Sequence, residues 1–280
     1  MTPDEALALA CAAFDVHPGG AHVLRAADAI TIALDEDHVA RVIPAPDGDT
    51  SRVLAAALLL PRLLQRLDDP VERGGALIVA YPRVTPGLDG VADLAPAGAS
   101  LAAHHAHGRT LLHRDAVDLP AFDPLRLAKR WLAQAPAVLG AEGGSDLLRA
   151  VEARWPLVTG AAAVLHADAH PANWFADDAG PWLMLDPEYL SIGPAVYDLA
   201  PLEVVERRLG AGPSRFASAR GGYEDLEGPV DEAALDAAIG VRELLAVAWL
   251  AARAADDATA ERARARLGDV LAGRPGSWRA

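Results

Sequence analysis

Residues 164–200 constrain the fold of this chain more than any other stretch. An apolar entry leads into the segment HADAHPAN, and a second apolar run, GPWLML at 180–185, leads into DPEY. Turn-forming residues at 176–180 separate the two halves, so we expect a loop and a hairpin that returns Asp186 to the side of Asn173. The stretch includes the polar residues His166, Asp168, His170, Asn173, Asp186, Glu188 and Asp198.

The carboxylates and the amide of this stretch suit the transfer of a phosphoryl group. Such a transfer needs little covalent chemistry and much positioning, so one carboxylate, Asp168, is enough to accept the proton of an attacking hydroxyl. Asn173 and Asp186 offer hard oxygen ligands of the kind that Mg²⁺ prefers. The spacing therefore predicts one base and two metal ligands beside a phosphate group.

The same residues resemble the aminoglycoside phosphotransferase and choline kinase family, which shares the protein-kinase fold. His166, Asp168 and Asn173 match the family's catalytic loop, written here as H-x-D-x-H-P-x-N. The segment LDPE (185–188) is similar to its metal-binding segment, and DLA (198–200) is similar to the start of the helix below the site. Three motifs in the same order are more specific than any one of them.

The resemblance implies an α+β, bilobal fold with a small β-rich N-lobe (1–80), a hinge (81–87) and a larger helical C-lobe (88–280). It implies an enzyme that uses Mg²⁺ and moves the γ-phosphoryl group of ATP, or of GTP, to a hydroxyl of a small molecule, such as an aminoglycoside or another antibiotic. The roles it assigns are base for Asp168, metal ligand for Asn173 and Asp186, and support of the loop for His166 and Asp198.

Other interpretations of these residues stay open. Asp198 precedes LAPLEVVERRL and is also suited to cap a helix there. His166, Asp168 and His170 alternate, and in a continuing strand all three would point the same way, as in a metallohydrolase. Pro171 argues against such a strand, because proline does not extend a central strand. A third alternative is a nucleotide-binding or scaffold protein of the same fold that has lost catalysis.

Composition and charge narrow the class of protein. A chain of 280 residues that is 52% hydrophobic can bury a core in one large domain or in two lobes. The formal charge of −14 disfavours nucleic acid and anionic membrane surfaces as partners. The lone Cys11 excludes an internal disulfide. The first residues are acidic, which does not fit a signal peptide. The longest apolar run, 53–60, is too short for a membrane span. We therefore expect a soluble, cytoplasmic protein.

Three short β-like runs follow a first helix that ends at Phe14. The runs are 22–26, 29–34 and 38–43. They predict an antiparallel meander, which the resemblance identifies as the nucleotide-covering sheet, with the turn 26–28 above the ATP although no GxGxxG is present. Arg41 lies on the third run, where the family places the basic residue that binds the α and β phosphates.

The next predicted helix, 51–67, lacks the carboxylate that should pair with Arg41. Its sequence, SRVLAAALLLPRLLQRL, holds no acidic residue, and Pro61 is expected to kink or divide it. Either the partner of Arg41 comes from elsewhere or Arg41 acts unpaired.

A buried strand is predicted at 76–84, and the prolines that follow it mark the hinge between the lobes. The resemblance places backbone groups of this region at the adenine edge, with Ala80, Tyr81 and Arg83 as the cofactor-binding residues. Beyond the hinge, apolar spacing predicts helices at 99–114, 125–134, 145–153, 200–209, 231–255 and 259–272, with a loop at 210–222.

Two polar clusters of the C-lobe need an interpretation. His104, His105, His107 and His113 spread over more than one helix face, which favours packing or surface roles over a metal site. The segment 223–236 holds six acidic residues and no Lys or Arg. The substrate-binding residues predicted there, which would attract a cationic acceptor, are Glu224, Asp225 and Glu227. The alternative is that acids near 231 cap and stabilise a helix start.

Overall fold

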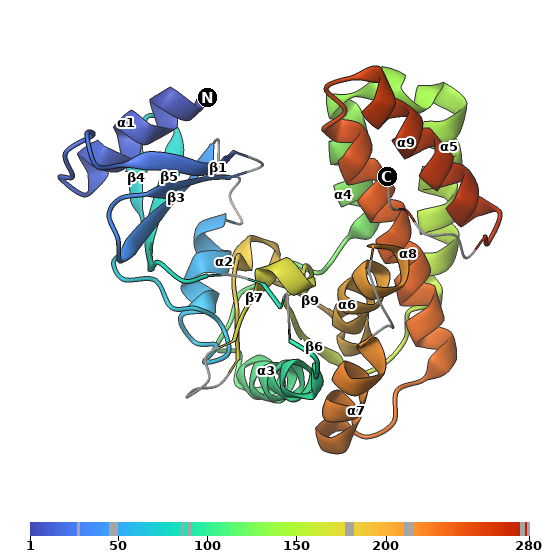
Figure 1. Ribbon diagram of the computed structural model, residues 1–280. Coiled ribbons are helices and arrows are strands. Elements are labelled where there is room, and N and C mark those ends of the chain that lie inside the picture. Colours follow the sequence, from blue (N-terminus) through green and yellow to red (C-terminus); the bar gives the residue numbers. More distant parts are fainter. Residues whose placement is uncertain are drawn as a thin grey trace.

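A five-stranded antiparallel sheet and a larger group of helices form the two lobes of the protein (Figure 1). The computed structural model describes residues 1–26, 29–44, 50–85, 87–88, 91–176, 182–209, 215–274 and 278. The strands of the large sheet are β1 (His22–Ala26), β2 (Ile30–Ala33), β3 (His38–Pro44), β4 (Val71–Arg73) and β5 (Ala76–Pro82). The helices are α1 (Pro3–Ala13), α2 (Thr50–Ala57), α3 (Ala95–His113), α4 (Pro124–Gln134), α5 (Pro136–Arg154), α6 (Ala200–Val204), α7 (Phe216–Glu227), α8 (Glu232–Ala252) and α9 (Asp257–Leu271). The predicted α+β, bilobal architecture is confirmed.

The sheet has the order β1-β2-β3-β5-β4, and its first three strands agree closely with the predicted runs. Successive side chains of a strand point to opposite faces. Ala40 and Val42 are accordingly buried against α1, whereas Val39 and Ile43 pack with Leu54 of α2. Arg41 alternates with the first pair, so it faces α2 and the helical lobe. The turn predicted above the nucleotide, at 27–28, lies outside the described residues.

Helix α2 ends at Ala57, so the prediction of a helix over 51–67 is wrong beyond that point. Pro61 has no N–H to donate to the Ala57 carbonyl, so the helical hydrogen-bond ladder stops there. The amide of Gln65 instead donates to the carbonyls of Leu60 and Leu63, at 3.0 Å each, and holds the following turns in place.

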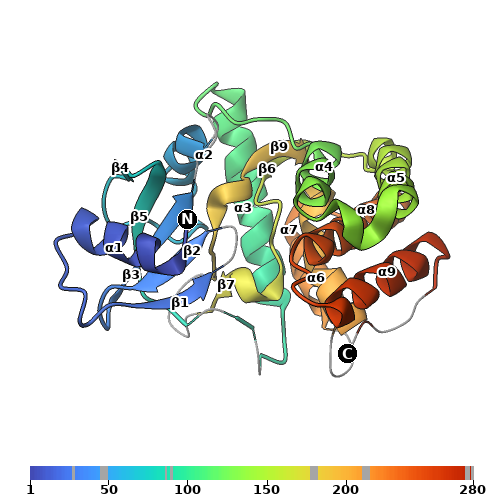
Figure 2. The same ribbon diagram turned by 90° about the horizontal axis from the view of Figure 1, so that it is seen from above.

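Helix α3 lies between the sheet and the helices α4, α5, α8 and α9 (Figure 2). Its backbone comes so close to that of α7 that the contact requires glycine. A Cβ on Gly98 would lie 1.7 Å from the carbonyl oxygen of Ala219, and a Cβ on Gly222 would lie 2.1 Å from that of Ala95.

The prediction of a loop at 210–222 is wrong from Phe216 onward, where α7 begins. Residues 210–214 lie outside the described part. The Gly-, Ser- and Arg-rich composition indicated a loop, but packing against α3 outweighs that local preference. Helix α5 also starts earlier than the predicted 145–153, because Gly140, with φ 69°, joins a preceding helical turn to the main helix.

Helices α4, α5 and α9 pack around α8 and form the part of the C-lobe farthest from the sheet (Figure 1). The bounds of α4, α8 and α9 agree with the predicted helices to within a few residues. Among the residues that the structure describes, none of the helices combines the length and apolarity needed to cross a membrane.

Two small sheets carry the stretch 164–200. In one, β6 (Ala162–Leu165) pairs with β9 (Ser191–Pro194), and in the other, β7 (Trp174–Phe175) pairs with β8 (Leu183–Met184). The N–H of Leu185 donates to the carbonyl of Asn173 at 2.8 Å, so the hairpin returns Asp186 to the side of Asn173 as predicted. The turn of this hairpin, 177–181, lies outside the described residues.

Candidate active site

A cavity of about 960 Å³ lies between the sheet and the helical lobe. Arg41 lines it from the sheet, Asp168 and Asp186 line it from the small sheets, and α4 and α8 form the opposite wall. The sequence predicted a role in catalysis or cofactor binding for these three residues, and the fold brings them to one cavity.

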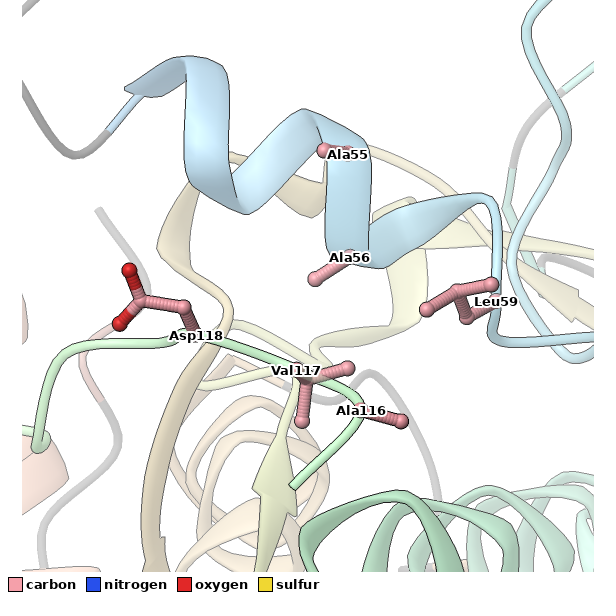
Figure 3. Close-up of a pocket in the computed structure, with 6 residues that line it drawn as sticks. All are labelled: Ala55, Ala56, Leu59, Ala116, Val117 and Asp118. Atoms are coloured by element: carbon pink, nitrogen blue, oxygen red, sulfur yellow. The ribbon is translucent and has the colours of Figure 1, made fainter. Parts of the chain in front are cut away.

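A second hollow, of about 180 Å³, lies between α2 and the segment that follows α3 (Figure 3). Its lining residues are Ala55, Ala56, Leu59, Ala116, Val117 and Asp118. Leu59 and Asp118 stand at opposite ends, and small apolar side chains lie between them (Figure 3). A binding site for a small molecule needs several convergent polar groups, so the larger cavity is the candidate site.

The loop after β6 is held by one buried carboxylate. Asp198 accepts hydrogen bonds from the backbone N–H groups of His166 and Ala167, both at 2.7 Å, and lies 3.0 Å from Nε2 of His105. Ala167 has φ 63°, a left-handed conformation that a non-glycine residue keeps only with support. The side chain of Asp198 does not cap α6, which follows it. Burial would raise the pKa of Asp198, but the hydrogen bond from His105 and the nearby histidines hold that pKa below its usual value.

Asp168 is oriented by two groups that are distant in the sequence. Arg242 of α8 donates to Oδ1 of Asp168 at 2.7 Å, and the amide of Asn173 donates to Oδ2 at 3.1 Å. Burial would raise the pKa of Asp168, but the Arg242 guanidinium and the neighbouring histidines outweigh burial and lower it. The carboxylate is therefore ionised near neutral pH and lines the cavity, as the residue that orients a hydroxyl must.

The carboxylate partner of Arg41 is Glu188, in the segment LDPE. Nε of Arg41 donates to Oε1 of Glu188 at 2.6 Å, and Nη1 of Arg41 lies 2.7 Å from Oδ1 of Asp186. Burial would lower the pKa of Arg41, but these two carboxylates outweigh it and raise the pKa further. Arg41 is therefore paired, and the acid that α2 lacks is supplied from the other lobe.

The oxygens of Asn173 and Asp186 fit a magnesium ion. The amide nitrogen of Asn173 donates to the carbonyl of Asp168 at 2.9 Å and to its carboxylate, which leaves Oδ1 of Asn173 as the atom able to bind a cation. Asp186 has φ 61° and ψ 64°, a left-handed conformation that Asp adopts more readily than most residues. One carboxylate, one amide oxygen and the phosphates of a nucleotide form a usual ligand set for Mg²⁺.

The alternation of His166, Asp168 and His170 does not form a metal site. β6 ends at Leu165, so these residues do not continue a strand. The His166 ring points inward, with Nε2 at 2.7 Å from the carbonyl of Leu185 and Nδ1 at 3.3 Å from the N–H of Asp168. In the described part of the chain, no three His, Cys, Asp or Glu side chains converge as metal ligands. The metallohydrolase interpretation therefore has no support in the structure.

The cofactor-binding residues predicted at the hinge do not line the cavity. Tyr81 is buried against the sheet, the carbonyl of Ala80 accepts from the N–H of Leu67 at 2.9 Å, and the N–H of Arg83 donates to the loop before β3. β5 pairs with β3 over Ala76–Pro82 and with β4 at Ala76, Leu77 and Ile78, so its ladder hydrogen bonds lie within the N-lobe. Residues 87–88, further along the connection, do line the cavity.

The acidic residues predicted to bind the acceptor also lie elsewhere. Glu224, Asp225 and Glu227 belong to α7 and are not part of the cavity wall. Glu224 accepts from Nε of Arg220 at 2.8 Å, and Glu227 pairs with Arg109 of α3. The first pair lies within α7, and the second joins α7 to α3, which lies beside it at the bottom of Figure 1. The structure gives this segment a packing role instead of a place in the cavity.

The sequence analysis missed Arg242 and the role of Glu188. The one signal for Arg242 is the charged pair Arg242-Glu243 within a long apolar helix. Glu243 accepts from Nε of Arg208 at 2.6 Å, so each member of the pair is bound on a different side of α8.

The histidine cluster of α3 is partly buried, and burial lowers the pKa of His104 to about 3. His105 connects Asp198 to the hydroxyl of Tyr223, at 3.0 Å on each side.

Comparisons with known proteins agree with this geometry. Solved structures that share the fold include a microcompartment-associated aminopropanol kinase, with a TM-score of 0.71 at 17% identity over 98% of this chain and 100% of that chain. An amicoumacin kinase in complex with AMP-PNP and Ca²⁺ has a TM-score of 0.72 at 11% identity, with 94% and 91% covered. A choline kinase from Streptococcus pneumoniae has a TM-score of 0.65 at 16% identity, with 91% and 93% covered.

A search of curated protein sequences gave no match. The sequence profile of one family, described as the phosphotransferase enzyme family, matches residues 22–225. This range holds the large sheet, the candidate catalytic loop and the hairpin with Asp186, and it is most of the chain. The protein therefore belongs to the phosphotransferase enzyme family, as its sequence motifs predicted.

Proposed function

We propose that the protein is a cytoplasmic kinase that transfers the γ-phosphoryl group of ATP, as its Mg²⁺ complex, to a hydroxyl of a small molecule. One observation carries the proposal: Arg41, Asp168 and Asp186 line one cavity although they come from separate elements, and buried Asn173 donates a hydrogen bond to Asp168. Membership of the phosphotransferase family supports it.

In this reaction the hydroxyl oxygen of the acceptor forms a bond to the γ-phosphorus. The bond between that phosphorus and the leaving oxygen of ADP breaks, and the hydroxyl proton passes to Asp168. Asp168 is held at both carboxylate oxygens by Arg242 and Asn173, so it is preorganised to orient the acceptor. Arg41, fixed by Glu188, can bind two phosphate oxygens with its planar guanidinium. The metal ion, held by Asn173 and Asp186, would neutralise charge on the β and γ phosphates.

Structural relatives support a nucleotide and a divalent ion as cofactors. The amicoumacin kinase structure contains AMP-PNP and Ca²⁺, and an aminoglycoside 2'-phosphotransferase that shares the fold was solved with GDP. Aminopropanol and choline, named in two other relatives, are small molecules with one hydroxyl. Calorimetry with ATP and GTP, each with and without Mg²⁺, distinguishes the two nucleotides for this chain.

The function is tested by incubating the purified protein with Mg²⁺-ATP and a panel of small hydroxyl compounds, with detection of a phosphorylated product by mass spectrometry. The Asp168→Asn variant is the control for contaminating kinases. Absence of Mg²⁺-dependent nucleotide binding would refute the proposal. Nucleotide binding without any product would favour the alternative of a binding protein that has lost catalysis. That alternative was suggested by the absence of a carboxylate from α2, and Glu188 supplies this carboxylate in the structure.

A further inference from the structure

The charged side chains on the wall of the cavity opposite the sheet are mostly arginines. We propose that the acceptor carries an oxyanion, a carboxylate or a phosphate, in addition to its hydroxyl. This inference rests on the proposed function, since it takes that wall as the acceptor side. It names a class of acceptor opposite in charge to the cationic one that the acidic segment 223–236 suggested.

We call one side of the cavity the helical wall. It consists of the cavity-lining residues of α4, α8 and α9, those of the segment just before α4, and Trp278. Among the described residues of this wall, the charged ones are Arg126, Arg130, Arg242, Arg253, Arg266 and the single carboxylate Asp123. The whole chain has 39 acidic and 25 basic residues, so its average composition would give the opposite balance. The excess of positive charge on this wall therefore does not follow from the average composition of the chain.

The spacing along α8 shows how the wall is organised. Arg242, Trp249 and Arg253 all line the cavity, and their separation places them on one face of the helix. Arg242 binds Asp168, and Arg253 lies about three turns, or about 16 Å, further along the axis. A hydroxyl at Asp168 and an anionic group further along this wall would thus belong to the two ends of one small molecule.

Two of the arginines are held by aromatic rings instead of carboxylates. The guanidinium of Arg130 lies 5.8 Å from the centre of the Tyr189 ring, and that of Arg266 lies 5.3 Å from the Trp278 ring. Their hydrogen bonds go to neutral groups, the hydroxyl of Tyr189 at 3.4 Å and the carbonyl of Trp278 at 2.8 Å. An aromatic face positions a guanidinium but leaves its full charge in place.

The arginines at the catalytic end of the cavity are bound differently. Arg41 pairs with Glu188 and Asp186, and Arg242 pairs with Asp168. Among the described residues, Arg130 and Arg266 have no such carboxylate partner. Burial lowers the pKa of Arg266, and the like charge of nearby Arg262 lowers it further. An oxyanion bound at either of these arginines would supply the missing negative charge and accept its paired N–H donors.

The same wall also offers apolar surface. Trp131, Trp249 and Trp278 line it together with the arginines. Sites for small molecules combine such aromatic surface with a few polar groups that fix orientation. A cationic acceptor would instead meet several arginines, and like charges placed together cost binding energy. The acceptor class that fits best is a hydroxyl compound with an apolar or aromatic body and an oxyanion at the other end.

The test uses three probes that share a ring and a hydroxyl and differ in charge: para-hydroxymethyl benzoate, para-hydroxymethyl benzamide and para-hydroxymethyl benzylamine. Binding of each to the protein saturated with Mg²⁺-AMP-PNP is measured by NMR, and phosphorylation in the presence of Mg²⁺-ATP is measured by mass spectrometry. We expect the benzoate to bind about tenfold more tightly than the benzamide and the benzylamine to bind most weakly. This preference should decrease with salt, because ions screen the charge of the wall.

Substitutions in the helical wall test whether its arginines cause the preference for the benzoate. Arg130→Gln and Arg266→Gln should each reduce the benzoate preference several-fold, and Arg130→Lys, which keeps the charge, should retain more of it than Arg130→Gln. Arg149→Gln is the matched control, because Arg149 lies on α5, has 72% of its side chain exposed and does not line the cavity.

The outcomes separate the acceptor class from the proposed function. Benzoate binding that is undetectable, or no tighter than that of the benzamide, overturns the oxyanion inference, and phosphorylation of any hydroxyl compound would still support the kinase. Tight benzoate binding that depends on Arg130 and Arg266 supports the inference. If no hydroxyl compound were then phosphorylated, the proposed function would fail while the oxyanion site stands.

Discussion

Replacement of Asp198 with asparagine should lower the free energy of unfolding by about 3–5 kcal/mol and displace the catalytic loop. The carboxylate is fully buried, and its two oxygens serve different donors. Oδ2 accepts from the N–H of His166 and lies 3.0 Å from His105, while Oδ1 accepts from the N–H of Ala167. The exchange alters one atom of the side chain, so the volume of the core stays almost unchanged.

The magnitude follows from the hydrogen bonds that asparagine is unable to make. If its oxygen replaces Oδ2, its NH₂ group faces the N–H of Ala167, so one charge-assisted hydrogen bond is lost, at a cost of about 1.5–3 kcal/mol. The buried N–H of Ala167 is left without an acceptor, which costs about 1–3 kcal/mol more. Ala167 is the residue with φ 63°, so the same loss releases the left-handed turn just before Asp168. Turnover should therefore fall together with stability.

Urea unfolding followed by tryptophan fluorescence measures the effect, with Asp256→Asn as the matched control. Asp256 caps α9 on the surface, and asparagine caps helices as well as aspartate does, so this control should unfold like the wild type. Because the pKa of Asp198 is lowered in the folded state, its contribution is present above about pH 4 and is lost as the pH falls through the folded pKa. The difference between variant and wild type should narrow only in that acidic range. A loss below about 1 kcal/mol at neutral pH, with turnover intact, would refute the role of Asp198 as a brace.

Three further predictions follow from the site and from the helix packing. Asp168→Asn should lower turnover by about 10²-fold to 10⁴-fold while calorimetry shows nearly unchanged nucleotide affinity, and an unchanged rate would remove Asp168 from the mechanism. Asp186→Ala should weaken nucleotide binding and its Mg²⁺ dependence together, and a titration with the Mg²⁺ dependence of the wild type would contradict its assignment as a ligand. Gly222→Ala should destabilise the protein by about 1–3 kcal/mol in urea unfolding, because its Cβ meets the α3 backbone. Gly221→Ala, in open space on the same helix, should be neutral or stabilising. Equal effects of the two substitutions would argue against the close contact.

The features that depend on short segments were predicted from the sequence. The strands around Arg41, the hairpin between Asn173 and Asp186 and the fold class all match, because each depends on alternation, turn residues or a motif within a few positions. The end of α2 was misplaced because Leu-rich sequence continues past Ala57, and only the missing N–H of Pro61 stops the helix. Local patterns thus predicted most of the elements, whereas the limit of α2 depends on one missing hydrogen bond and α7 depends on packing against α3.

The partners of the two main charged site residues were beyond the reach of local patterns. Glu188 is 147 positions from Arg41, and Arg242 is 74 positions from Asp168. The positive helical wall has the same origin, since arginines of α4, α8 and α9 come together only when these helices pack. The acidic segment 223–236 was conspicuous in the sequence, but Glu224 forms an ion pair within α7 and Glu227 forms one with Arg109 of α3. The run of like charges in the sequence therefore does not coincide with the wall of the cavity.

The group of Arg41, Asp186 and Glu188 holds one more carboxylate than cation. Burial, and then the charge of Asp186, raise the pKa of Glu188 in spite of the ion pair with Arg41. Within this group, one negative charge has no counterion. A divalent cation with its nucleotide would complete that balance through Asp186. Arg41 would keep Glu188 as its partner and turn its remaining donors to the phosphates. Because the two carboxylates lie two positions apart on one turn, a single segment, LDPE, would then hold both the arginine and the metal, and α2 would need no acid of its own.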